Sequence, residues 1–304
     1  MLGEAVMRSP EHPPVKRAWQ LWRDRRGRVS ALRIATLALL LMPLAKALYE
    51  ADAILHGARP LNDLIHRAGF WALMFLALTL AVTPLRGIAR FGGLIDIRRM
   101  LGVGAFIHIA THLSLFTADQ SFDLLKVFGE ISRRIYLIIG ATAWLGLAVL
   151  AATSTDGMVR RLGGRKWRRL HRAVYAIALL ALIHYFQQTK ADLTVPTFAA
   201  GLFAWLIGYR LLAWRLGVPE LSSLMLLALS VGIAILTILG EAIGIGIVFH
   251  VSPLRVLVTV FDFDVGIRPG WQVLAVGLGA VALNVVRSRW RKPARPGAAA
   301  LAAE

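Results

Sequence analysis

The chain has 304 residues, of which 57% are hydrophobic, and its mean hydropathy is +0.63. This is more apolar surface than one globular core can bury, so much of it must face lipid. Lys and Arg outnumber Asp and Glu by 35 to 17, but these charges fall between the apolar runs. That pattern favours a membrane protein over a nucleic-acid-binding protein. The chain has no Cys, which excludes disulfides and thiolate metal sites, so any metal must be held by His, Met or a carboxylate.

The chain begins with a basic segment at residues 1–30, which has neither the apolar core nor the cleavage site of a secretory signal. We expect it to be a cytoplasmic tail. Eight apolar runs follow that are long enough, or nearly so, to cross the ~30 Å hydrocarbon core as helices of ~20 residues. They lie at about residues 31–49, 66–84, 100–117, 134–153, 171–187, 195–214, 221–250 and 270–287.

These runs predict an all-α fold, a polytopic transmembrane helical bundle of about eight helices. The fifth run is the shortest, and the seventh is long and rich in Gly, which allows a tilt or a break. Glu241 within the seventh run needs a partner or a wet cavity, because a carboxylate is costly in hydrocarbon.

Basic and acidic loops alternate between the apolar runs. Clusters of Arg and Lys occupy residues 85–100, 154–172 and the C-terminal end, whereas the intervening loops carry Asp and Glu. Short cytoplasmic loops accumulate Lys and Arg, so both termini are predicted to be cytoplasmic, in a multi-pass protein of the bacterial inner membrane. The alternative interpretation of each basic run is a docking face for a cytoplasmic partner.

Three His residues stand out by their depth in the predicted spans. His112 comes about 13 residues into the third span, which places it ~20 Å deep. His184 follows His171 by 13 residues on the fifth span, which runs in the same direction. His112 and His184 therefore share one level, and His171 lies one leaflet away. Two neutral imidazoles at one depth suit the axial positions of a non-covalent b-type haem, whereas the alternative for each is a hydrogen-bonded core residue.

Several segments also carry a family resemblance. They are Thr83-Pro84-Leu85, Arg98-Arg99-Met100-Leu101-Gly102 before His112, Ala143-Trp144-Leu145, and Trp167-Arg168-Arg169-Leu170-His171 through to His184-Tyr185. In order and spacing they resemble the MsrQ family, the haem-binding membrane subunits of the periplasmic protein-methionine-sulfoxide reductase system, within the ferric-reductase-like transmembrane group. The resemblance covers about residues 31–214. It implies a six-helix haem-binding domain there, followed by an additional two-helix membrane extension at 215–290 and a C-terminal tail at 291–304.

The resemblance implies transmembrane electron transfer through one or two haems b. Electrons would come from a cytoplasmic flavin reductase or the quinol pool. They would pass to a periplasmic molybdenum-containing MsrP-like reductase, which repairs methionine sulfoxide in oxidised envelope proteins. FMN is a further option by resemblance alone. The chain has no Gly-x-Gly-x-x-Gly strand–helix unit for NAD(P)H and no complete substrate site of its own, so the donor must be another molecule.

A second haem depends on His171 and Arg98. Relatives with two stacked haems offer two His, 13 or 14 residues apart, on each of two helices, whereas here Arg98 stands 14 residues before His112. We expect His171 to hold a haem on the cytoplasmic side, with Arg98 opposite it as a weak ligand or beside a propionate. Otherwise Arg98 is a positive charge that anchors its span. On an ideal helix His171 and His184 lie on nearly opposite faces, so a kink or a helix start near His171 is required.

Two other functions remain open at this point. A transporter without haem would use polar residues within the spans, such as Glu241, His108 and Asn284. A ferric reductase would pass its electrons to another acceptor, such as external iron. His108 fits a structural or hydrogen-bonding role, and His66 lies either near the outer haem or at the membrane interface. Membrane lipid is the remaining expected partner, and no nucleic acid is expected.

Overall fold

The computed structural model describes residues 20–24, 27–189, 192–264 and 266–289. Most of the predicted tail at 1–30 and all of the predicted tail at 291–304 lie outside these residues. The described part is helical, with one isolated β-bridge between Arg23 and Val29. The α-helices are α1 (Ala31–Tyr49), α2 (Ala51–Leu55), α3 (Pro60–Ile88), α4 (Arg98–Asp119), α5 (Leu124–Arg133), α6 (Ile135–Ala152), α7 (Asp156–Leu162), α8 (Gly164–His171), α9 (Val174–Gln188), α10 (Thr194–Leu216), α11 (Ser223–Phe249), α12 (Pro253–Val258) and α13 (Pro269–Arg289), with 3-10 turns η1 (Gly92–Asp96) and η2 (Thr259–Phe261).

Seven helices of the described chain are long and apolar enough to cross a membrane, namely α1, α3, α4 with η1, α6, α10, α11 and α13. They coincide with seven of the eight predicted spans, and the protein is a polytopic helical membrane protein. The remaining predicted span, the fifth at 171–187, corresponds to α9, which begins only at Val174 and has 15 residues, whereas His171 is the last residue of α8. Since ~20 residues cross the hydrocarbon core, α9 is short for a span. α11 is unbroken over 27 residues, so its glycines do not break it.

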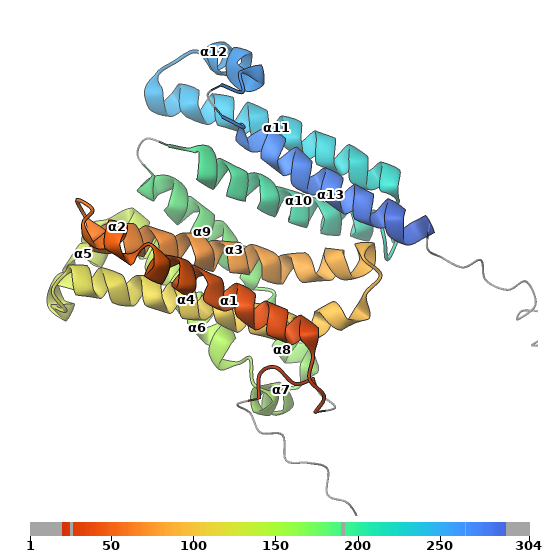
Figure 1. The fold of residues 1–304 in the computed structure, drawn as a ribbon, viewed down its shortest axis with the longest axis horizontal. Coiled ribbons are helices and arrows are strands. Elements are labelled where there is room, and N and C mark those ends of the chain that lie inside the picture. Colours follow the sequence, from red (N-terminus) through yellow and green to blue (C-terminus); the bar gives the residue numbers. More distant parts are fainter. Residues whose placement is uncertain (1–19, 25–26, 190–191, 265, 290–304) are drawn as a thin grey trace, which may run out of the picture.

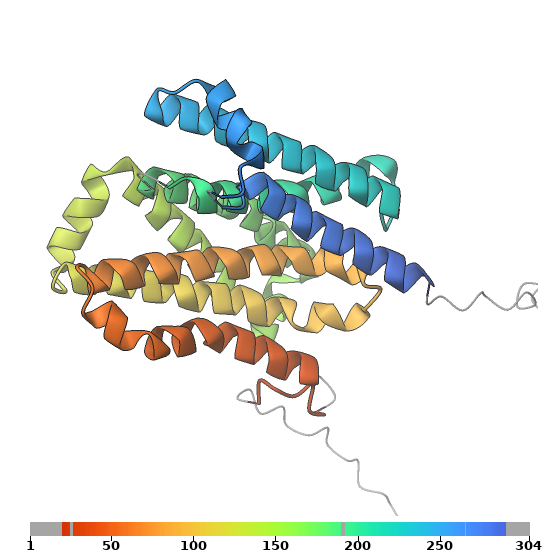
Figure 2. The ribbon, with the colours of Figure 1, turned by 45° about the horizontal axis from the view of Figure 1, so that its top comes forward.

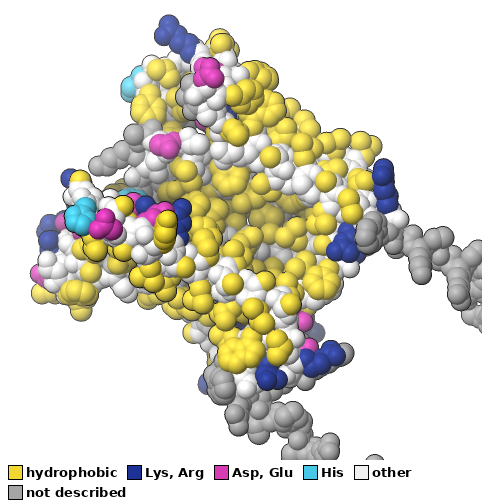
Figure 3. Space-filling view, viewed as in Figure 1, with side chains coloured by type: hydrophobic (Ala, Val, Ile, Leu, Met, Phe, Trp, Pro, Cys, Tyr) yellow, Lys and Arg dark blue, Asp and Glu magenta, His cyan; other side chains and the backbone are white. Residues whose placement is uncertain are grey.

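The two ends of the bundle are named here after the two ends of α4, the Arg98 end and the Asp119 end. α1, α3 and α4 lie side by side between these ends, with α2 and α5 at the Asp119 end (Figures 1 and 2). Hydrophobic side chains cover the middle of the face in Figure 3, and Lys, Arg, Asp and Glu lie toward its margins. This is the distribution expected of a surface that meets lipid in the middle and water at both ends.

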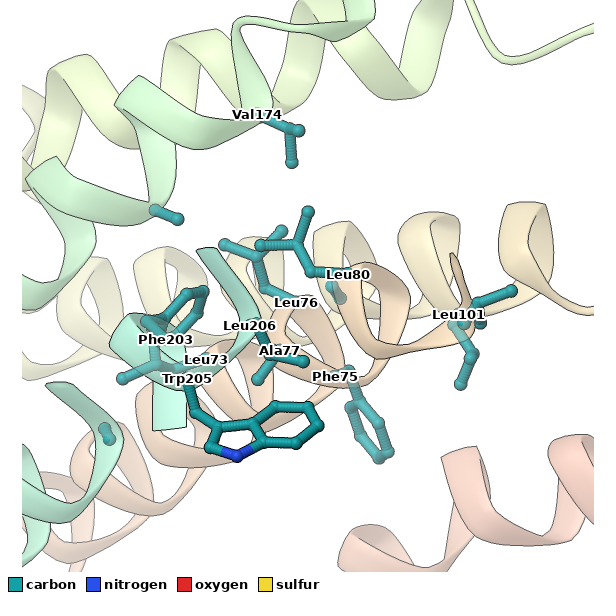
Figure 4. Close-up of a cluster of buried hydrophobic side chains, with 14 of the residues drawn as sticks. Leu73, Phe75, Leu76, Ala77, Leu80, Leu101, Val174, Phe203, Trp205 and Leu206 are labelled. Atoms are coloured by element: carbon teal, nitrogen blue, oxygen red, sulfur yellow. The ribbon is translucent and has the colours of Figure 1, made fainter. Parts of the chain in front are cut away.

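α3 is the central helix of the core. In its most apolar stretch 56% of the residues are buried, against 11% in α1. Phe75, Leu76 and Leu80 of α3 are almost inaccessible and belong to one cluster with Phe203 and Leu206 of α10 (Figure 4). α3 also packs along α4, so it links the helices on its two sides and fixes their relative position.

The extension formed by α11 and α13 packs on α10 through small residues and satisfied polar groups. The Trp205 indole N–H donates a hydrogen bond to the Ser230 hydroxyl at 3.0 Å, and Gly277 of α13 lies against both residues. Glu241, whose side chain is 2% exposed, pairs with Arg268 at 3.2 Å. The expectation that Glu241 requires a partner is therefore confirmed.

Other polar groups that a transporter could use also have partners. The Asn284 amide N–H donates to the Ser223 hydroxyl at 3.2 Å. His108 Nε2 lies 3.1 Å from the carbonyl oxygen of Leu40 on α1, and the His108 ring packs 4.9 Å from the Phe75 ring. His108 therefore takes part in the packing of α1 against α4, as its expected hydrogen-bonding role implies.

Gly277 and Gly279 offer a matched test of the packing of α13. An added Cβ at Gly277 would lie 2.5 Å from Ser230 Cβ, whereas one at Gly279 would meet nothing within 4 Å. We expect Gly277→Ala to cost about 1–3 kcal/mol of stability through overpacking. Gly279→Ala should be neutral or stabilise by up to about 1 kcal/mol, because Ala is the better helix former. Thermal unfolding of the detergent-solubilised variants measures both effects, and equal melting temperatures would contradict this packing.

Candidate functional site

A cavity of about 380 Å³ lies between α3, α4, α6 and α9. Apolar side chains such as Leu73 and Leu147 line it, and three His residues, His66, His112 and His184, also face it. Polar side chains line the part that lies toward the Asp119 end. They are Asn62, Asp119, Gln120, Glu130, Arg134 and Gln188. The cavity is thus apolar within the bundle and polar toward one end.

His112 and His184 lie beside each other in this cavity. Their ring centres are 6.3 Å apart and their planes are nearly perpendicular, at 89°. His112 Nδ1 lies 2.8 Å from the carbonyl oxygen of Ile65 on α3, and His184 Nδ1 lies 2.7 Å from that of Tyr136 on α6. The structure gives Nε2 of neither ring a hydrogen-bond partner among the described residues. Each ring therefore has one anchored and one available nitrogen.

A glycine lies one helical turn after each of these carbonyls. Gly69 follows Ile65 by four residues and Gly140 follows Tyr136 by four. A Cβ at Gly69 would lie 3.1 Å from His112 Nδ1, and one at Gly140 would lie 2.8 Å from His184 Nδ1. Residues four apart occupy the same face of a helix, so any larger side chain at these positions would push the ring away from its carbonyl.

The separation of the two ring centres fits a pair of imidazoles that share one haem iron. A metal–imidazole bond is about 2 Å long and the ring centre lies about 1 Å beyond the nitrogen, so two rings on opposite sides of one metal have centres about 6 Å apart. The observed 6.3 Å agrees with this separation. A carbonyl bound to Nδ1 fixes the ring orientation and leaves Nε2 as the ligand atom, a common arrangement around metal-binding His.

His171 and Arg98 lie apart from this cavity, toward the Arg98 end. His171 stacks on Trp167 with ring centres 3.8 Å apart, and its Nε2 lies 3.3 Å from the Ser154 hydroxyl. Burial lowers the pKa of His171, and the positive charges of Arg98 and Arg99 act in the same direction. The structure thus brings His171 near Arg98 but separates both from His112 and His184. The required break is present, since α8 ends at His171 and α9 begins at Val174.

Sequence reasoning missed the helices that hold the two central rings. Ile65 and Tyr136 hold the rings through their backbone oxygens. Every residue has such an oxygen, so the side-chain types in the sequence do not show which residue will act in this way. The one available signal was the glycines, because Gly69 and Gly140 each interrupt an apolar span one turn after the carbonyl. The sequence analysis also did not single out Arg134. This residue lines the polar part of the cavity, where it pairs with Glu130 at 2.8 Å and donates a hydrogen bond to the Tyr136 hydroxyl at 3.0 Å.

Comparison with known proteins gives the family. The family described as "Ferric reductase like transmembrane component" matches residues 68–182. The chain is 44% identical over 166 residues to the protein-methionine-sulfoxide reductase heme-binding subunit MsrQ of Xanthomonas oryzae pv. oryzae. These 166 residues make up 54% of this chain and 74% of that protein. The same-named subunits of Xanthomonas campestris pv. campestris and Rhodospirillum rubrum are 41% identical over 196 residues and 40% identical over 192 residues. These matches cover 62% of this chain and 88% and 89% of the relatives.

No solved structure matches the chain. The match to the ferric-reductase-like family begins within α3 and ends within α9. It therefore contains His112 with α4 and α6, stops two residues before His184, and excludes the α11–α13 extension. The relatives are similar over most of their own length, and the chain belongs to the MsrQ family of haem-binding subunits of protein-methionine-sulfoxide reductases.

Proposed function

We propose that this protein carries electrons across the bacterial inner membrane through b-type haem, with His112 and His184 as the axial ligands of a haem near the Asp119 end. The observation that carries the proposal is the pair of imidazoles 6.3 Å apart, each anchored through Nδ1 to a backbone carbonyl. Haem supplies one-electron chemistry, because its iron alternates between the ferric and ferrous states.

The protein's own residues hold and shield this site. The carbonyls of Ile65 and Tyr136 fix the tautomer of each ring, so that Nε2 carries the lone pair that a metal requires. Apolar side chains around the rings exclude water, which favours a buried, weakly polar cofactor. Arg134 at the polar part of the cavity is placed to face carboxylate groups of a bound ligand.

The direction of electron flow follows from the charges of the loops. The Arg98 end carries Arg98, Arg99 and the basic segment 154–172, and short loops rich in Arg and Lys stay in the cytoplasm. Electrons then enter at the Arg98 end, from a flavin reductase or quinol, and leave at the Asp119 end. The acceptor there is a periplasmic MsrP-like methionine sulfoxide reductase. The name of the relatives, heme-binding subunits of a protein-methionine-sulfoxide reductase, supports a reductase as the partner.

A second haem near His171 shortens the distance that each electron must cross. One haem near the Asp119 end leaves most of a ~30 Å core for a single step. His171 lies at the start of the segment that leads to His184, and Arg98 acts on it electrostatically. His171 Nδ1 lies 3.1 Å from the carbonyl of Trp167 one turn earlier in its own helix, and its Nε2 lies 3.3 Å from the Ser154 hydroxyl, so its anchoring differs from that of the other two rings, which a neighbouring helix holds.

Replacing the proposed ligands tests the haem assignment. His112→Ala and His184→Ala should each abolish or convert the low-spin spectrum of the haem near the Asp119 end, because each removes one of its two imidazoles, while His108→Ala should keep it. His171→Ala should lower the haem-to-protein ratio from about two to about one. Reduced-minus-oxidised spectra and haem extraction measure these effects.

Three results would contradict these assignments. Wild-type spectra in both cavity variants would exclude His112 and His184 as the ligands. A ratio near one that His171→Ala leaves unchanged would exclude the second haem. A folded, colourless wild-type protein would favour a transporter.

The two glycines provide a second test that leaves the ligands in place. Gly69→Ala and Gly140→Ala should displace the rings and convert part of the haem to a high-spin form, because each Cβ comes within about 3 Å of a ring nitrogen. Gly102→Ala is the matched control, since its Cβ would meet Thr79 at an ordinary 3.6 Å. Electron paramagnetic resonance separates the two spin states. Unaltered spectra in Gly69→Ala and Gly140→Ala would show that the rings are not held as proposed.

The orientation can be tested with single Cys residues, because the chain has none of its own. Gly129 of α5 and Gly157 of α7 both have room for a side chain. An impermeant maleimide added to spheroplasts should label Gly129→Cys and should not label Gly157→Cys until the cells are lysed, because the basic segment 154–172 stays in the cytoplasm. The opposite pattern would reverse the proposed topology and the direction of electron flow.

A further inference from the structure

α5 crosses the end of the bundle instead of running along it. This helix of 10 residues follows α4 at the Asp119 end, and Figure 2 shows it lying across the direction of α3 and α4. Ser121 and Phe122 form the turn between α4 and α5, and both have a left-handed backbone, with φ of 57° and 59°. The carboxylate of Asp123 caps the new helix, because it accepts a hydrogen bond from the backbone N–H of Lys126 at 3.0 Å. α5 therefore lies at the level where the α4 span ends.

One side of α5 faces the bundle. The helix packs against α6. On this side Val127 is buried, and Glu130 and Ile131 line the cavity that contains His112 and His184. α5 thus forms part of the wall of this cavity, at its polar end.

The rest of α5 is exposed and has two sides of different character. Leu124, Leu125 and Phe128 are large and apolar, yet they are exposed by 70%, 87% and 71%. Lys126 and Arg133 are also exposed, and neither forms an ion pair with a carboxylate of the described chain. At about 100° per residue, the two cations lie roughly opposite the three apolar side chains. The surface that α5 turns away from the bundle is therefore amphipathic.

The apolar side of α5 continues into a surface that faces lipid. α6 is a membrane span that begins directly after α5, and near its start Ile135 and Ile138 are exposed. α12 repeats the arrangement of α5 at the same end of the bundle (Figure 1), since Val256 is buried whereas Leu254 and Val258 are exposed. Two helices far apart in the sequence thus expose apolar side chains where the spans end. A lipid surface surrounds the bundle and can cover both of them.

We propose that α5 lies in the surface of the membrane at the Asp119 end, with Leu124, Leu125 and Phe128 among the lipid acyl chains and Lys126 and Arg133 toward the lipid phosphates. Amphipathic helices of this kind bury their apolar side ~5–10 Å into the boundary between headgroups and acyl chains, and their Lys and Arg attract anionic lipids. The lipid surface then supports one wall of the cavity from outside, because the same helix lines it. This position of α5 depends neither on the proposed haem nor on the direction of electron flow.

Fluorescence quenching in vesicles tests this position. The chain has no Cys, so Leu125→Cys and Phe128→Cys each accept a single bimane label, and Lys126→Cys is the matched control on the opposite side of the same helix. The whole protein is reconstituted into vesicles of dioleoyl-phosphatidylglycerol and dioleoyl-phosphatidylcholine. Lipid brominated on its acyl chains should quench the labels at 125 and 128 at least about twofold more than the label at 126, because the apolar side lies ~5–10 Å into the lipid. Iodide in the water should give the opposite order.

The pattern of quenching separates lipid from a protein partner as the occupant of the apolar side. Quenching at 125 and 128 by iodide and not by brominated lipid would place this side in water, which would overturn the proposal in favour of a docking face for a protein. Equal quenching by brominated lipid at 125, 126 and 128 would overturn the proposed orientation of the helix. Size-exclusion chromatography checks the fold of each labelled protein. If Leu125→Cys or Lys126→Cys misfolds, Phe128→Cys and Arg133→Cys provide the same comparison.

Discussion

The anchoring of His112 and His184 by backbone carbonyls is the constraint on which the arrangement of the haem-binding helices depends. Each ring belongs to one helix and is held by another, His112 of α4 by α3 and His184 of α9 by α6. The two pairs of helices are built alike, with a carbonyl, a glycine one turn later, and a ring that fits against both. The cavity lies where the two pairs face each other. A shift of either pair by one residue would separate a ring from its carbonyl, so the packing of the pairs determines whether the site exists.

The second constraint is the cost of polar groups at membrane depth. Glu241, Asn284 and His108 all have partners within the protein, so these groups stabilise the contacts of α1, α11 and α13 with their neighbours. Arg210 of α10 likewise donates hydrogen bonds to the carbonyl oxygens of Leu206 and of Leu80 on α3, and it lies 5.8 Å from the ring centre of Tyr175 on α9. Polar groups within the bundle therefore hold neighbouring helices together, because a polar group without a partner is costly there.

α10 connects the haem-binding helices to the extension. Phe203 and Leu206 pack against α3, while Trp205 bonds to Ser230 of α11. α10 also packs on α9, and α13 on α3, so the extension contacts both of the helices that lie behind the His112 and His184 rings. The break between α8 and α9 has a comparable role at the other side of the cavity. Because His171 and His184 lie in different helices, the direction of the His171 side chain is not set by the turn of α9. The two rings, 13 residues apart, can therefore occupy separate parts of the bundle.

The sequence alone determined the membrane character, seven of the spans, and the common level of His112 and His184. Run length and hydropathy are local properties, and a helix advances by a constant rise per residue, so depth can be counted along the chain. It also predicted that a kink or a helix start must lie near His171, because helical phase is equally regular. It did not reveal that Ile65 and Tyr136 hold the rings, that Gly69 and Gly140 make room for them, or that Arg210 faces α3 and α9. Periodicity fixes directions only within one helix, whereas the rotation of each helix toward its neighbours depends on the packing of all of them, which only the tertiary structure decides.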